Sequence, residues 1–81
     1  MSIDDLEIKL REALAKRNQN QIHDAFCEFE RAGGLQAEAY ELGLKIDSEI
    51  MDIDEELDDM LRDVLDFVCG WCSPHNKIWK D

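Results

Sequence analysis

The residues of this 81-residue chain best suited to chemistry are its three cysteines and two histidines. Cys69 and Cys72 form a C-x-x-C element, and His75 follows three residues later. Thiolates and imidazoles are the usual ligands of structural zinc, and the same cysteine spacing occurs in redox pairs. His23 and Cys27 lie four residues apart, on one face of a predicted helix, and would complete a tetrahedral zinc site with that element.

The surroundings of these residues favour a structural role over a chemical one. Redox chemistry of the thioredoxin type needs the cysteines at the N-terminus of a helix, whereas this element lies at the C-terminal end of an acidic helix. Cys27 lies between Phe26 and Phe29, and Cys72 shares an apolar face with Val68, so we interpret both as reduced core thiols, with zinc as the alternative. Neither histidine has an acid and a nucleophile in a catalytic pattern, and we expect no enzymatic activity.

The elements that must position these residues are helices. The chain has one proline, no threonine and only two valines, a composition that disfavours strands. Apolar residues recur at helical spacing in four segments, so we expect an all-α fold: a single domain over residues 1–81, built as a small bundle of about four helices with a short C-terminal tail. The predicted helices cover about 3–17, about 22–32, about 35–46 and about 54–71.

The predicted core follows from the apolar stripe of each helix. Trp71 and Trp79 are interpreted mainly as residues that anchor and cover this core. The stripes are Leu6, Leu10, Ala13 and Leu14; Ile22, Ala25, Phe26, Phe29 and Ala32; Leu35, Ala39, Leu42 and Ile46; and Leu57, Met60, Leu61, Val64, Val68 and Trp71.

Signals for helix ends complete the predicted layout. Gly33 and Gly34 should end the second helix, and Ser73 and Pro74 the fourth. We interpret residues 47–53 as a connector, because the aspartates within and just after it are good helix caps. These capping residues are Asp52 and Asp54.

The overall charge restricts the possible partners. The chain has 20 acidic and 9 basic side chains and a formal net charge of −11. Such a charge repels nucleic acids and anionic lipids, so direct nucleic-acid or membrane binding is not expected. The sequence lacks both a membrane-spanning apolar run and a signal peptide, which predicts a cytoplasmic protein. No calcium-loop pattern is found, and we expect no cofactor and no metal.

Acidic residues are concentrated in the second half of the chain. Between Asp47 and Asp66 there are ten acids and one base. On a helix, Glu55 with Asp59 and Asp59 with Asp63 are like-charge pairs four residues apart, which destabilise it. This repulsion favours a face that meets a positively charged partner, while the alternative is a solvated face that keeps the chain soluble. The predicted partner-binding residues are Asp52, Asp54, Glu55, Glu56, Asp59, Asp63 and Asp66.

A loose pattern over residues 22–79 resembles a family of bacterial proteins. Its parts are Glu28–Gly34 at a helix end, the alanine- and leucine-bearing segment Ala37–Leu42, the acidic segment Ile46–Ile53 and the late Trp79. They are similar to the small all-helical immunity proteins that accompany polymorphic toxins, such as the Maf and contact-dependent inhibition systems.

The resemblance implies a cytoplasmic antidote that binds a cognate toxin domain, commonly a basic nuclease, and blocks its active site or an adjacent surface. The acidic residues would then contact lysines and arginines of the toxin. A different hypothesis is that the chain acts as a nucleic-acid mimic or a regulatory adaptor, occupying a basic protein that normally binds DNA or RNA.

Overall fold

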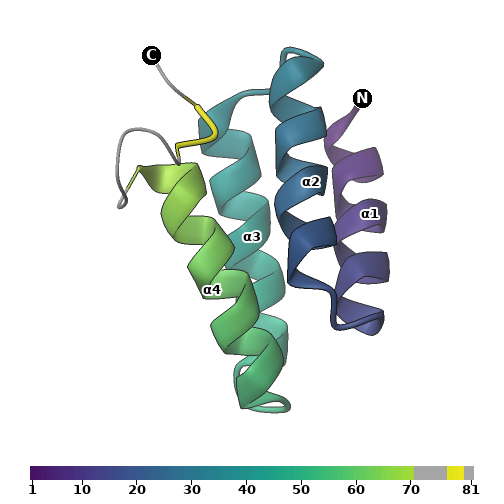
Figure 1. Ribbon diagram of the computed structural model, residues 1–81, viewed down its shortest axis with the longest axis vertical. Helices are drawn as coiled ribbons and strands as arrows, with labels where there is room; N and C mark the ends of the chain where they lie inside the picture. Colours follow the sequence, from purple (N-terminus) through teal and green to yellow (C-terminus); the bar gives the residue numbers. More distant parts are fainter. Residues whose placement is uncertain (71–76, 80–81) are drawn as a thin grey trace.

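Four α-helices make up the part of the chain that the structure, a computed structural model, describes: residues 1–70 and 77–79. Successive helices run in opposite directions (Figure 1), and this part contains no strand. The all-α bundle expected from the sequence is confirmed. No helix among the described residues is long and apolar enough to cross a membrane. The helices are α1 (Ile3–Ala15), α2 (Gln19–Arg31), α3 (Gln36–Ile50) and α4 (Glu55–Cys69).

The helices pack as two pairs around one core. α1 contacts mainly α2, and α3 contacts mainly α4, while α2 also packs on α4 and joins the two pairs. Burial of large apolar side chains where the pairs meet is the main source of stability in such a bundle. The largest fully buried side chains are Phe26, Phe29, Leu6, Leu10, Ile22, Ile46, Leu61, Val64 and Val68.

Side chains cap the first turns of α1, α2 and α4, whereas α3, whose N-cap is Leu35, has no side-chain cap. Ser2 and Asp5 form a capping box, in which each accepts a backbone N–H of the other, and Asn18 caps α2 with its side chain. Gly33 follows α2 with φ +88°, and Gly70 caps α4 with φ +89°. Because a side chain disfavours this left-handed conformation, α4 ends at Cys69, just before Gly70 and two residues before the predicted end at 71. Ser73 and Pro74, its predicted terminators, lie outside the described residues.

The prediction that residues 47–53 form a connector is wrong for the first four of them. α3 continues to Ile50, because Ile46 and Ile50 extend its apolar stripe and Asp47 is buried against α4. Only 51–53 form the turn to α4. Of the two predicted capping residues, Asp54 caps the start of α4, whereas Asp52 lies in the turn and caps no helix.

Three core assignments also differ from the sequence prediction. Leu35 is the N-cap of α3 and is 61% exposed, and Ala32 is the exposed C-cap of α2, so neither lies on a helix stripe. Leu65, which the predicted stripe omitted, is buried against Gly43, where a Cβ atom would overlap its side chain. Glycine therefore permits the close approach of α3 and α4. Trp71 lies outside the described residues.

The described residues of the C-terminal tail, 77–79, pack onto the end of the bundle (Figure 1). The backbone N–H of Ile78 donates to Phe67 O at 3.1 Å, and Ile78 is buried. The indole N–H of Trp79 donates to Gly34 O at 3.1 Å, and its ring meets Phe29 edge to face at 6.5 Å. The interpretation of Trp79 as a core anchor is confirmed.

Candidate partner-binding face

α4 separates an apolar side from an acidic side. Its buried residues fall at helical spacing and hold the helix on α2 and α3, which fixes the opposite side toward solvent. That opposite side carries five exposed carboxylates, which we call the acidic face: Glu55, Glu56, Asp59, Asp63 and Asp66.

Two of the predicted binding residues precede α4 and differ in their surroundings. Asp54 is its N-cap, accepting the backbone N–H groups of Glu56 at 3.1 Å and Leu57 at 3.2 Å. It also pairs with Arg17, and the hydrogen bond from this guanidinium is the main reason that the pKa of Asp54 is lowered. The carboxylate of Asp54 therefore serves the fold. Asp52, in contrast, is exposed in the turn.

The single base of α4 does not neutralise its acidic face. Arg62 Nε lies 3.3 Å from Asp47 Oδ2 of α3 and 3.1 Å from Asp58 Oδ1, so the guanidinium is held at the α3–α4 boundary. The remaining contacts of the face are weak: Glu56 lies 3.6 Å from Arg17 Nη1, and Asp63 accepts the amide of Gln19 at 3.4 Å. Among residues 1–70 and 77–79, the side-chain carboxylates of Glu55, Asp59 and Asp66 form no ion pair and accept no hydrogen bond.

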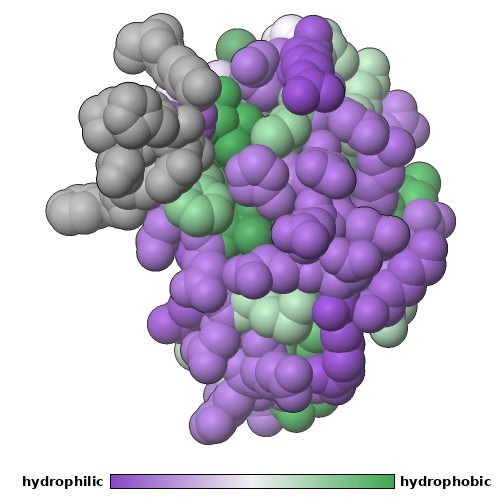
Figure 2. All heavy atoms as spheres, in the orientation of Figure 1, coloured by the Kyte–Doolittle hydropathy of each residue, from purple (hydrophilic) through white to green (hydrophobic). Residues whose placement is uncertain are grey.

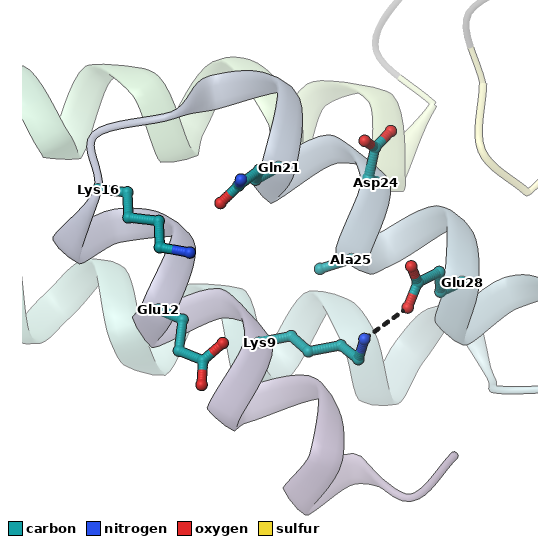
Figure 3. Close-up of a pocket in the computed structure, with 7 residues that line it drawn as sticks. All are labelled: Lys9, Glu12, Lys16, Gln21, Asp24, Ala25 and Glu28. Atoms are coloured by element: carbon teal, nitrogen blue, oxygen red, sulfur yellow. Dashed lines mark ion pairs between the residues drawn. The ribbon is translucent and has the colours of Figure 1, made fainter.

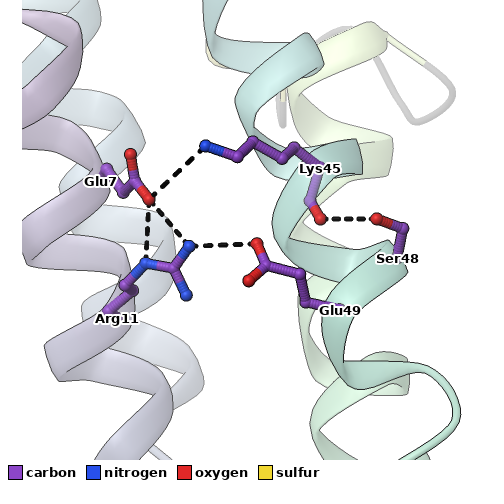
Figure 4. A network of polar contacts seen from close by, with 5 residues as sticks. All are labelled: Glu7, Arg11, Lys45, Ser48 and Glu49. Carbon is purple, nitrogen blue, oxygen red and sulfur yellow. Dashed lines mark hydrogen bonds and ion pairs between the residues drawn. The ribbon is translucent and has the colours of Figure 1, made fainter.

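The boundary between α1 and α3 has a balanced charge. Arg11 Nη2 lies 2.7 Å from Glu7 Oε2 and 3.0 Å from Glu49 Oε2, and Lys45 Nζ lies 3.9 Å from Glu7 Oε2 (Figure 4). The hydrogen bond from Arg11 is the main cause of a lowered pKa at Glu7. Two acids and two bases are thus matched in this network.

A similar match occurs between α1 and α2. Lys9 reaches across a hollow of about 270 Å³ to Glu28, with Nζ and Oε2 2.8 Å apart (Figure 3). This contact lowers the pKa of Glu28. Lys16 and Glu12 line the same hollow, so both signs of charge are present. The bases of α1 are therefore placed where they balance acids, away from the acidic face of α4.

A buried acidic pair between α3 and α4 was missed by the sequence analysis. Asp47 is only 6% exposed, and its pKa is raised, first by burial and then by interaction with Asp58; Arg62 offsets part of this effect. Helical spacing could have predicted the burial of Asp47, because this residue falls on the buried side of a helix that includes Gly43 and Ile50. Placing it in a connector concealed that signal.

The predicted zinc ligands are only partly covered by the structure. His23 Nδ1 and Cys27 Sγ lie 3.6 Å apart on one face of α2, and Cys69 ends α4. Cys72 and His75 lie outside the described residues. Within the part that is described, no group of three or more His, Cys, Asp or Glu side chains is arranged to hold a metal ion.

Comparison of the chain with protein-family models, with curated proteins and with solved structures found no match. Its function must therefore be inferred from its charges and contacts.

Proposed function

We propose that this chain is an immunity protein that binds and neutralises a cognate toxin domain through the acidic face of α4. The proposed toxin domain is a basic protein, and specifically a nuclease. The observation that carries the proposal is the unbalanced charge of that face. Arg62, the one base of α4, is held at the α3–α4 boundary, Arg17 reaches only Glu56 of the face, and the carboxylates of Glu55, Asp59 and Asp66 have no partner among the described residues.

The unbalanced charge carries a cost that a partner would relieve. Glu55 with Asp59 and Asp59 with Asp63 repel each other at four-residue spacing on an exposed helix. A cationic surface docked on these carboxylates turns repulsion into attraction, and the negative field accelerates the encounter. Asp54, already engaged as a cap and with Arg17, contributes charge to this field but no free carboxylate.

The proposed partner class follows from the same electrostatics. Nucleases and other proteins that act on nucleic acids carry positive surfaces matched to phosphate groups. An acidic helical face competes for such a surface without any chemistry of its own. This agrees with the resemblance of the sequence to helical immunity proteins.

The experiment that tests the proposal is capture of partners from a lysate of the source bacterium at low salt, followed by elution with a salt step and mass spectrometry. Wild-type bait is compared with two variants that each remove three of the 20 acidic charges. All six positions are exposed and lack an ion pair among the described residues. The acidic-face variant is E55Q/D59N/D66N, and the control variant is E12Q/D24N/E41Q.

We expect wild type and the control variant to recover one basic toxin domain, and the acidic-face variant to lose it. The recovered domain is then tested for inhibition by this chain. Recovery of a DNA- or RNA-binding protein of another kind would replace the immunity proposal with the nucleic-acid mimic. If all three baits capture the same proteins equally, the acidic face is not the binding surface.

A further inference from the structure

A groove runs along the seam between the first half of α2 and the middle of α4. Its volume is about 590 Å³, and α4 contributes one wall through Asp63, Asp66 and Phe67, while Gln19 and His23 line the α2 side. Figure 2 shows hydrophobic surface along the seam between α4 and α2, with hydrophilic residues on both sides. The groove thus borders the acidic face directly.

The base of this groove is apolar and aromatic. Phe67 is partly buried and packs against the core, and Val64 beside it is fully buried. The His23 ring meets Phe67 at 5.6 Å with an interplanar angle of 81°, an edge-to-face contact between α2 and α4. The aromatic ring therefore belongs to a fixed surface that is present before any partner arrives.

The rim of the groove is negative. Asp63 and Asp66 are exposed and three residues apart, which places their side chains next to each other on α4. Gln19 Nε2 donates to Asp63 Oδ2 and to Met60 O, both at 3.4 Å, and so ties the start of α2 to α4. No lysine or arginine lines the groove among the described residues.

Two other hollows among the described residues differ in this respect. The hollow between α1 and α2 contains Lys9 and Lys16, and the one between α1 and α3 contains Lys45, so each supplies its own cation. The α2–α4 groove combines two carboxylates with an aromatic ring and contains no lysine or arginine among the described residues. That combination is complementary to a planar, positively charged side chain.

We propose that the α2–α4 groove receives an arginine side chain of the basic partner, with the guanidinium at Asp63 and Asp66 and against the ring of Phe67. This inference rests on the proposed function and adds the contact that selects the partner. Arginine fits better than lysine, because its planar guanidinium stacks on aromatic rings, pairs with two carboxylates at once and is more weakly hydrated. Its methylene stem matches the apolar base of the groove.

The test is an NMR titration of the full chain with a blocked Gly-Arg-Gly tripeptide, compared with blocked Gly-Lys-Gly. The arginine probe should give saturable shifts centred on Asp63, Phe67 and His23, with an affinity about threefold higher than that of the lysine probe. D63N/D66N should weaken the arginine probe at least about threefold. E12Q/E41Q, which removes the same charge elsewhere on the surface, should change its affinity less than about twofold.

A second variant separates stacking from charge. F67L keeps an apolar side chain in the groove but removes the ring, so it should weaken the arginine probe more than the lysine probe and reduce the preference for arginine. Circular dichroism confirms that each variant is folded. Shifts spread over Glu55 and Asp59 without a centre at the groove, or equal affinities in wild type and D63N/D66N, would overturn the groove proposal. Neither result bears on the acidic-face proposal, which the lysate capture tests separately and without these peptides.

Discussion

Arg62 of α4 points its Nε at Asp47 of α3, 3.3 Å from Oδ2, across the boundary between the two helices. This contact explains two features of the molecule together. It gives a buried carboxylate a cationic neighbour, and it holds the single base of α4 at the helix boundary, where it leaves the carboxylates of the acidic face unneutralised. The packing of α3 on α4 and the charge of the acidic face are therefore linked through one side chain.

The raised pKa of Asp47 predicts a pH-dependent stability. The folded protein holds this proton more tightly than the unfolded chain, so the contribution of Asp47 is most favourable below the unfolded pKa of about 3.9 and falls as the pH rises through its folded pKa. Asp47→Asn should raise the free energy of unfolding near pH 7, and this gain should shrink near pH 4. Urea denaturation at both pH values measures it, with exposed Asp52→Asn as control; a loss of stability near pH 7 would contradict the raised pKa.

Close packing at Gly43 predicts a destabilising substitution where helix propensity alone predicts a gain. A Cβ atom at this position would overlap the side chain of Leu65, which is buried and has little room to move. Gly43→Ala should therefore lower the free energy of unfolding by about 1–3 kcal/mol, as overpacked cores do. Adding Gly43→Ala to an L65V variant, which has a smaller side chain at the contact, should cost less unfolding free energy than adding it to wild type. Thermal and urea unfolding report both, and an additive double variant would show that the two residues are not in conflict.

The two roles of Asp54 can be separated by substitution. Asp54→Ala removes both the cap of α4 and the ion pair with Arg17, and should cost about 0.5–2 kcal/mol of unfolding free energy. Asp54→Asn keeps an oxygen that can cap the helix and should cost less. Asp52→Ala, two residues earlier and exposed, should change stability by less than about 0.5 kcal/mol. Equal losses for the alanine variants at both positions would argue against Asp54 as the cap.

The contact of Trp79 with the bundle predicts that the tail contributes to stability. Trp79→Phe keeps a ring against Phe29 but loses the hydrogen bond to Gly34 O, which is worth about 0.5–1.5 kcal/mol. Trp79→Ala loses both the ring contact and the hydrogen bond, and should lower the free energy of unfolding further than Trp79→Phe does. Hydrogen exchange of the Ile78 amide, which donates to Phe67 O, is a local readout and should accelerate in both variants. Unchanged exchange would show that the tail is held without the indole.

The spacing of apolar residues was sufficient to predict the bundle, because each stripe must be buried and four stripes on a short chain leave few other arrangements. The prediction of the end of α3 was wrong because two local signals competed there. Around Asp52 the capping signal suggested an early end to α3, whereas Ile46 and Ile50 continued its stripe to the turn. The burial of Leu65 depends on how closely α3 approaches α4, and that distance is set by a single glycine on the partner helix.

The candidate site was predictable to a similar extent. Helical spacing placed Glu55, Asp59 and Asp66 on the solvent side of α4, and they are exposed there. The pairing of Asp54 with Arg17 joins residues 37 apart in sequence, so no local pattern contains it. The α2–α4 groove likewise depends on the packing of two helices that are not neighbours along the chain.

The most direct test of the central claim is the association rate of this chain with the basic domain captured from the lysate, measured by stopped flow over a range of ionic strength. Wild type and the control variant E12Q/D24N/E41Q should associate rapidly and slow steeply with salt. The acidic-face variant E55Q/D59N/D66N should associate about tenfold more slowly at low salt and depend less on salt, because the field that steers the encounter has been weakened. Equal rates and equal salt dependence for all three proteins would contradict the account.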